Sequence, residues 1–86
     1  MEYTIYCVRD EKLDMARYGA LICQENDSAA MRSFAHECMK EDSLWNSHPS
    51  DYSLWKLGTY YMATGEIISY PPEKVCEATD FVRKEK

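Results

Sequence analysis

Residues 48–67 read HPSDYSLWKLGTYYMATGEI, and this stretch decides the fold. Residues 48–51 form a turn signal, because proline fixes φ and Asp or Ser side chains bond nearby backbone amides. Aromatic and branched residues then fill 52–61, which is typical of a strand. Residues 63–65 offer a short loop whose glycine is free to take positive φ, and a second strand is expected over 66–70. The stretch therefore predicts a β-hairpin.

Two more strands are expected before the hairpin. Residues 3–8 are rich in branched and aromatic side chains and predict the first strand. Residues 17–24 predict a second strand, antiparallel to the first across a charged turn, although Gly19 and Ala20 weaken the pattern.

A helix is expected between these strands and the hairpin. Asn26, Asp27 and Ser28 are residues that cap helix N-termini. The apolar positions that follow have the i, i+3, i+4, i+7, i+8 spacing of an amphipathic helix: Met31, Phe34, Ala35, Cys38 and Met39. The helix is expected to end near residues 41–42, and Leu44 and Trp45 are expected to close the end of the core.

A second helix is expected after the hairpin. Pro71, Pro72 and Glu73 suit a strand exit and a helix start, because proline is favoured in the first helical turn. A short helical stripe follows: Val75, Ala78, Phe81 and Val82. The order β-β-α-β-β-α predicts an α+β fold, a mainly antiparallel four-stranded sheet with its helices packed on one face. We expect one domain over residues 1–83 and a charged tail over 84–86.

Composition limits the function classes. Eighty-six residues support one modest core, and a formal net charge of -5 gives the chain no long-range attraction for phosphate. The four cysteines are widely spaced and form no Cys-x-x-Cys pair, so reduced and mostly buried thiols are expected rather than a metal site or disulfides. His36 and His48 belong to separate elements, and no nucleophile–base pair or phosphate loop can be argued from spacing. We expect neither an enzyme nor a cofactor, and no stretch is long and apolar enough for a membrane span.

Both faces of the third strand carry apolar or aromatic groups. Strict alternation puts one set on one face: Trp55, Leu57, Thr59 and Tyr61. A sheet covered on one side only normally shows polar residues on its other side. Three covers for the second face therefore stay open: a second copy of the chain, stacked nucleobases, or the C-terminal helix together with residues 44–45. A homo-oligomer, most simply a dimer, is expected.

Aromatic rings interleaved with cations on a sheet are one way to bind single-stranded nucleic acid. The candidate residues for binding DNA or a partner are Arg17, Trp55, Lys56 and Tyr61. Trp55 and Tyr61 would stack on bases, and Arg17 and Lys56 would meet phosphates. Alternation puts Lys56 opposite to Trp55, so its side chain must reach round an edge or a bulge must re-aim it.

The hairpin motif resembles one known family. The motif reads His48-Pro49-x-Asp51-Tyr52-x-Leu54-Trp55-x-Leu57-Gly58-x-Tyr60, followed by Thr64-Gly65-x-Ile67. It is similar to the small non-structural protein of gokushoviruses, which are single-stranded DNA phages of the microvirus group. The length, the first strand and a helix containing Arg32-x-Phe34-Ala35 extend the resemblance over most of the chain. Tyr61-Met62 and the four cysteines depart from the family pattern.

The resemblance implies an accessory protein made in the infected bacterial cytoplasm and absent from the mature capsid. It implies DNA binding during genome replication or packaging, but no residue roles that could be transferred by position. Two functions stay open: a single-stranded DNA-binding accessory, and an oligomeric adaptor that touches phage or host replication or assembly proteins without contacting DNA. They predict opposite salt dependence, because phosphate contacts release counterions and an apolar interface does not.

Overall fold

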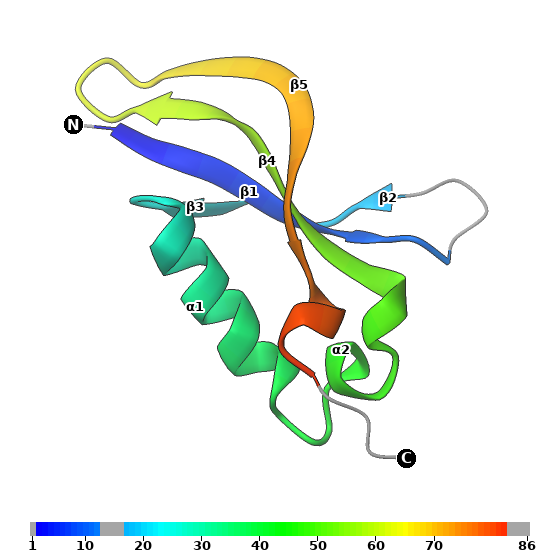
Figure 1. Ribbon diagram of the computed structural model, residues 1–86. Coiled ribbons are helices and arrows are strands. Elements are labelled where there is room, and N and C mark those ends of the chain that lie inside the picture. Colours follow the sequence, from blue (N-terminus) through cyan, green and yellow to red (C-terminus); the bar gives the residue numbers. More distant parts are fainter. Residues whose placement is uncertain (1, 13–16, 83–86) are drawn as a thin grey trace.

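The structure is built on one antiparallel sheet, and the helices lie on one side of that sheet (Figure 1). The computed structural model describes residues 2–12 and 17–82. The strands are β1 (Glu2–Asp10), β2 (Arg17–Tyr18), β3 (Ile22–Gln24), β4 (Tyr52–Tyr61) and β5 (Glu66–Glu77). The helices are α1 (Asp27–Cys38) and α2 (Leu44–Ser47), with single 3-10 turns η1 (Pro49–Asp51) and η2 (Ala78–Asp80). The expected α+β class and antiparallel sheet are confirmed.

The predicted second strand is split into two short pieces, and both pair with β1. Tyr18 of β2 lies opposite Arg9, and Cys23 of β3 lies opposite Ile5. The split falls at the weak position expected from sequence. The Gly19 amide donates to the Val8 carbonyl at 2.9 Å, and a Cβ at Gly19 would lie only 3.1 Å from that oxygen.

The hairpin that decides the fold is confirmed. β4 covers the predicted 52–61, and the loop closes through a 2.8 Å hydrogen bond from the Gly65 amide to the Tyr61 carbonyl. Gly65 has φ 78°, the left-handed conformation for which a glycine was expected there. The sheet order is β2-β1-β4-β5, with β3 also on β1, so the hairpin adds its own second strand at one edge.

The C-terminal region differs most from the expectation. Residues 71–77 do not begin a helix but continue β5, and of the residues described after it, up to 82, only 78–80 form a helical turn, the 3-10 turn η2. Lys56 pairs with Glu73 and Gly58 with Ser69, so residues 70–72 form a bulge opposite Leu57. Prolines lack an amide donor and are tolerated at bulges and on edge strands, and β5 is an edge strand. The spacing of apolar residues after residue 74 is compatible both with a helix and with a longer strand, so the sequence could not distinguish the two.

The core lies between the sheet and α1. Asn26 caps α1 as expected, its side-chain oxygen accepting from the Ala29 amide at 2.9 Å. The buried cluster contains Tyr6, Ala30, Phe34, Cys38, Leu54, Cys76 and Ala78. The helix ends at Cys38, earlier than expected, and Met39 is exposed. Trp45 packs on Phe34 with ring centroids 5.2 Å apart, as expected, but Leu44 is exposed and does not close the core.

The two faces of the sheet are covered very differently. Tyr6 and Val8 of β1 point toward α1, and we call their side the helix face. Ile5, Cys7 and Arg9 alternate with them and lie on the opposite side, which we call the open face. Helix α2 and turn η2 contribute to the core on the helix face, so among the described residues they do not cover the open face. One of the three covers left open by the sequence is thereby removed.

The hairpin end of the sheet extends beyond the helices (Figure 1). The Cα atoms span 49 × 27 × 18 Å, and α1 lies beside only part of that length. The described helices leave both faces of the hairpin end without cover.

The cysteines are free thiols, and three of them are buried as expected. Burial raises the pKa of Cys38 to about 11 and that of Cys76 to about 12, so both stay protonated at neutral pH. Cys23 is exposed, on the open face.

Candidate nucleic-acid interface

A bulge in β4 changes the two faces predicted by strict alternation. Lys56 pairs with Tyr6, whereas Gly58 pairs with Ile5, so Leu57 has no partner in β1. The alternation of side chains between the two faces is therefore shifted by one position after Leu57. Trp55 lies on the open face, and Tyr61 lies on the helix face at the hairpin end. The expectation that these two rings share a face was wrong.

Lys56 lies on the helix face and is held by carboxylates. Its Nζ is 3.2 Å from Asp27 Oδ2 and 3.8 Å from Glu73 Oε1. The hydrogen bond from Lys56 and that from the Tyr6 hydroxyl, at 2.5 Å, both end on Asp27. The hydrogen bond to Asp27 raises the pKa of Lys56, and the bond from Tyr6 lowers the pKa of Asp27. Lys56 thus links β4 to the start of α1. It does not lie beside Trp55, where it was predicted to meet a phosphate.

Asp27→Ala is expected to lower the free energy of unfolding by about 1–2 kcal/mol at neutral pH, because the buried Tyr6 hydroxyl loses its acceptor. The lowered pKa of Asp27 means that its contribution is present above the ordinary aspartate pKa of about 4 and is lost as the pH falls through the folded value. Urea unfolding at neutral and acidic pH measures this. An effect that is equal at both pH values would contradict the role given to the carboxylate.

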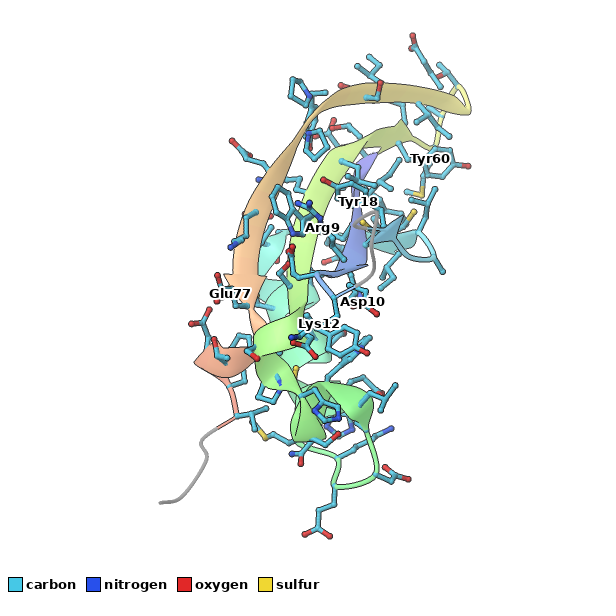
Figure 2. All side chains as sticks on the ribbon, turned by 90° about the vertical axis from the view of Figure 1, so that its right-hand side faces the viewer. Arg9, Asp10, Lys12, Tyr18, Tyr60 and Glu77 are labelled. Carbon is cyan, nitrogen blue, oxygen red and sulfur yellow. The ribbon has the colours of Figure 1, made fainter. Side chains whose placement is uncertain are left out.

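On the open face, Arg9 lies between two aromatic rings. Its guanidinium carbon is 5.2 Å from the centre of the Tyr18 ring and 5.1 Å from that of Trp55. The two rings meet edge to face at 5.9 Å, and Lys74 Nζ lies 6.0 Å from the Trp55 ring. We call Arg9, Tyr18, Trp55 and Lys74 the cation–aromatic cluster. Figure 2 views this side of the sheet, with Arg9 and Tyr18 in front of the strands.

Strand register brings the cluster together. Arg9 pairs with Tyr18 across β1 and β2, and Trp55 pairs with Lys74 across β4 and β5. Trp55 also pairs with Cys7, two residues from Arg9 on the same face of β1. Directly opposed side chains lie about 5 Å apart at Cβ, and diagonal neighbours remain within reach of long side chains. Four strands thus contribute one cation or ring each.

Two carboxylates partly neutralise the cluster. Glu11 lies 3.7 Å from Arg9 Nε, and Glu77 lies 2.6 Å from Lys74 Nζ. Both are ion pairs near the surface, and such pairs contribute little stability. The hydrogen bond between Lys74 and Glu77 raises the pKa of Lys74 and lowers that of Glu77. Lys74 is therefore charged at neutral pH, and phosphate must compete with these carboxylates for both cations.

Ser53 fixes the position of Trp55. The indole Nε1 donates to Ser53 Oγ at 2.7 Å, and the Ser53 hydroxyl donates to Glu11 at 2.9 Å. The buried Arg9 Nε makes no hydrogen bond within the described part of the chain. An open depression of about 330 Å³ adjoins these groups. The arrangement presents fixed rings and two cations to a ligand from solution.

The four predicted binding residues do not form one site. Trp55 belongs to the cation–aromatic cluster, and Lys56 and Tyr61 lie on the other face. Arg17 pairs with Asp10 in the β1–β2 ladder, and its side chain lies outside the described part of the structure. The charged tail also lies outside it.

Sequence reasoning missed three members of the cluster. Extending the predicted first strand by one residue and pairing it with 17–24 across the turn would have placed Arg9 opposite Tyr18. Lys74 was not recognised as a member of the cluster because residues 71–82 were predicted to form a helix and not a strand. The sequence carries no signal for that extension of β5, because the prolines are tolerated there only through the edge position of the strand.

Within residues 2–12 and 17–82, no group of three or more His, Cys, Asp or Glu side chains is placed to hold a metal ion. No described helix combines the length and apolar character needed to cross a membrane.

Comparison with known proteins identifies one family. Residues 3–81 match the family described as Phage ORF5 protein, which is nearly the whole chain. No curated protein and no solved structure matches this chain.

Proposed function

Because the chain belongs to the phage ORF5 protein family, we propose that it is a non-enzymatic phage accessory protein that binds single-stranded DNA on the open face of its sheet. The hairpin motif supports a more specific assignment, to the non-structural proteins of gokushoviruses. DNA would then be bound in the cytoplasm of the infected bacterium, during genome replication or packaging.

The cation–aromatic cluster is the observation that carries this proposal. Bases stack on aromatic side chains with about 1–3 kcal/mol per base, without strict sequence preference, when nearby cations follow the backbone. Tyr18 is exposed and Trp55 half-buried, so both rings are reachable from solvent. Arg9 and Lys74 lie beside these rings and would meet phosphates.

The acidic charge of the chain shapes how such binding would work. At a net charge of -5, long-range attraction cannot supply the affinity, so stacking must supply most of it. Glu11 and Glu77 would have to release Arg9 and Lys74, or share them with phosphate. We therefore expect modest affinity with a shallow dependence on salt.

Trp55→Ala is expected to weaken binding of a fluorescein-labelled oligo(dT) by roughly 1–3 kcal/mol, because one stacking platform is lost. Tyr61→Ala is the matched control, since Tyr61 lies on the same strand but on the helix face. Fluorescence anisotropy measures the affinities, and circular dichroism checks that both variants stay folded. Equal loss in the two variants, or no loss with Trp55→Ala, would contradict the assigned surface.

Intrinsic fluorescence gives a second readout of the same site. Stacking should quench Trp55, whereas Trp45 packs on Phe34 in the core. In a Trp45→Phe background, oligo(dT) should quench the remaining emission. Unchanged emission at saturating oligonucleotide would argue against a stacked Trp55.

The second candidate function is a protein–protein adaptor for phage or host replication or assembly proteins. One observation favours it: Leu21 and Ile67 are exposed apolar side chains, at 63% and 62% of their possible surface. Tight binding of a replication or assembly protein together with undetectable DNA binding would favour this function.

A further inference from the structure

The open face has a second zone, at the hairpin end, that differs from the cation–aromatic cluster. A depression of about 190 Å³ lies there, lined by Ile5, Leu21, Leu57, Gly58, Ile67 and Ser69. We call this set the apolar cup. Leu57, which has no partner in β1, lines it together with its open-face neighbour Gly58. Leu21 and Ile67 project from its rim because they are the most exposed of its apolar members.

The strand positions around the apolar cup carry no charge. Strand register adds three neighbours on the same face: Tyr3, Cys23 and Tyr60. Figure 2 labels Tyr60 at this end, away from Arg9 and Glu77. Charged residues make up 29% of the chain, yet none occupies these strand positions. Depletion of charge with enrichment of tyrosine marks the centre of protein interfaces.

The chain exposes more surface than is expected for a folded monomer of its mass. A folded monomer of 10.1 kDa is expected to expose roughly 5,300 Å², whereas this chain exposes 6001 Å². The hairpin end, which no described helix covers, is where the uncovered apolar side chains lie.

We propose that a second copy of this chain covers the apolar cup, in a two-fold contact of open face against open face. Two copies of charge -5 repel one another, and the uncharged cup is a surface through which they can meet without opposing like charges. A two-fold contact requires a self-complementary surface. The projecting Leu21 and Ile67 beside a depression provide this, because the rim of each copy enters the cup of the other.

Nucleic acid is a poor occupant of the same zone. The apolar cup and its neighbouring strand positions offer no cation to a phosphate. The contact also uses none of the four residues of the cation–aromatic cluster. Self-association can therefore be tested independently of DNA binding.

Ile67→Glu tests this contact directly. Sedimentation equilibrium of the wild-type protein at micromolar concentration should give a dimer, and Ile67→Glu should give a folded monomer because each copy would bury an unpaired carboxylate in the apolar cup of the other. Ile68→Glu is the matched control, because Ile68 is the next residue of β5, is 46% exposed and faces the other side. The control should stay dimeric. A monomeric wild type, a dimeric Ile67→Glu or a monomeric Ile68→Glu would each overturn the proposal.

Cys23 offers a readout on the unmodified chain, independent of whether a variant folds. It lies opposite Ile5 on the open face, while Cys7, Cys38 and Cys76 are buried. Reaction of Cys23 with a maleimide should slow as the protein concentration rises through the dimerisation range. A labelling rate that does not change with concentration would overturn the proposal and leave the apolar cup to a different protein.

Discussion

Phe34→Ala is expected to lower the free energy of unfolding by about 3–5 kcal/mol, the usual cost of truncating a buried phenylalanine. Phe34 is 3% exposed and lies at the centre of the core cluster. Its ring contacts Trp45 at 5.2 Å and Phe81 at 6.1 Å between centroids, so it joins α2 and the C-terminal segment to α1. No other described side chain holds these three segments together through ring contacts.

Urea unfolding followed by circular dichroism measures the loss. Met39→Ala is a suitable control, because Met39 follows the same helix but is exposed, and surface truncations usually change stability by less than about 0.5 kcal/mol. A Phe34→Ala protein as stable as the control would contradict the packing of α1 described here.

Gly58→Val is expected to destabilise the protein by about 3 kcal/mol, the upper end of the usual range for overpacking. A Cβ at Gly58 would lie 2.5 Å from the Ile68 carbonyl oxygen and 3.1 Å from the Ser69 Cα. Both are backbone atoms, so no side chain can move aside. The Tyr70 hydroxyl also donates to the Gly58 carbonyl at 3.2 Å, which ties β5 to β4 beside the bulge.

Gly65→Ala separates this effect from a general intolerance of glycine replacement. Nothing lies within 4 Å of a Cβ at Gly65, so only its positive φ of 78° opposes alanine, at about 1–2 kcal/mol. Thermal unfolding of both variants measures the difference. If Gly58→Val were no worse than Gly65→Ala, the close approach of β5 to β4 at the bulge would be wrong.

Local signals predicted the fold well. The turn at 48–51 and the glycine at 65 delimit β4, and the cap residue Asn26 marks the start of α1. These features depend on the conformation of a few neighbouring residues, so the sequence contains them directly. The same holds for Phe34, whose burial follows from its position in the helical stripe.

The parts that sequence could not predict depend on pairing between distant segments. The bulge at Leu57 arises only when β1 and β5 both pair with β4, and it moves Tyr61 to the face opposite Trp55. Extension of β5 through Pro71 depends likewise on the edge position of that strand. A binding site on a sheet depends on the register between strands. Of the predicted site residues, Trp55 therefore lies in the cation–aromatic cluster, and its partners there were not predicted.

Salt dependence of single-stranded DNA binding tests the central claim most directly. The wild-type protein should bind labelled oligo(dT) in fluorescence anisotropy, with a slope of log affinity against log salt of about -1.4. That is the value for two phosphates neutralised on a single strand. Arg9→Ala should reduce the slope by about one ion's contribution. Absence of binding at low salt, or a slope unchanged by Arg9→Ala, would contradict the account of the open face as a DNA-binding surface.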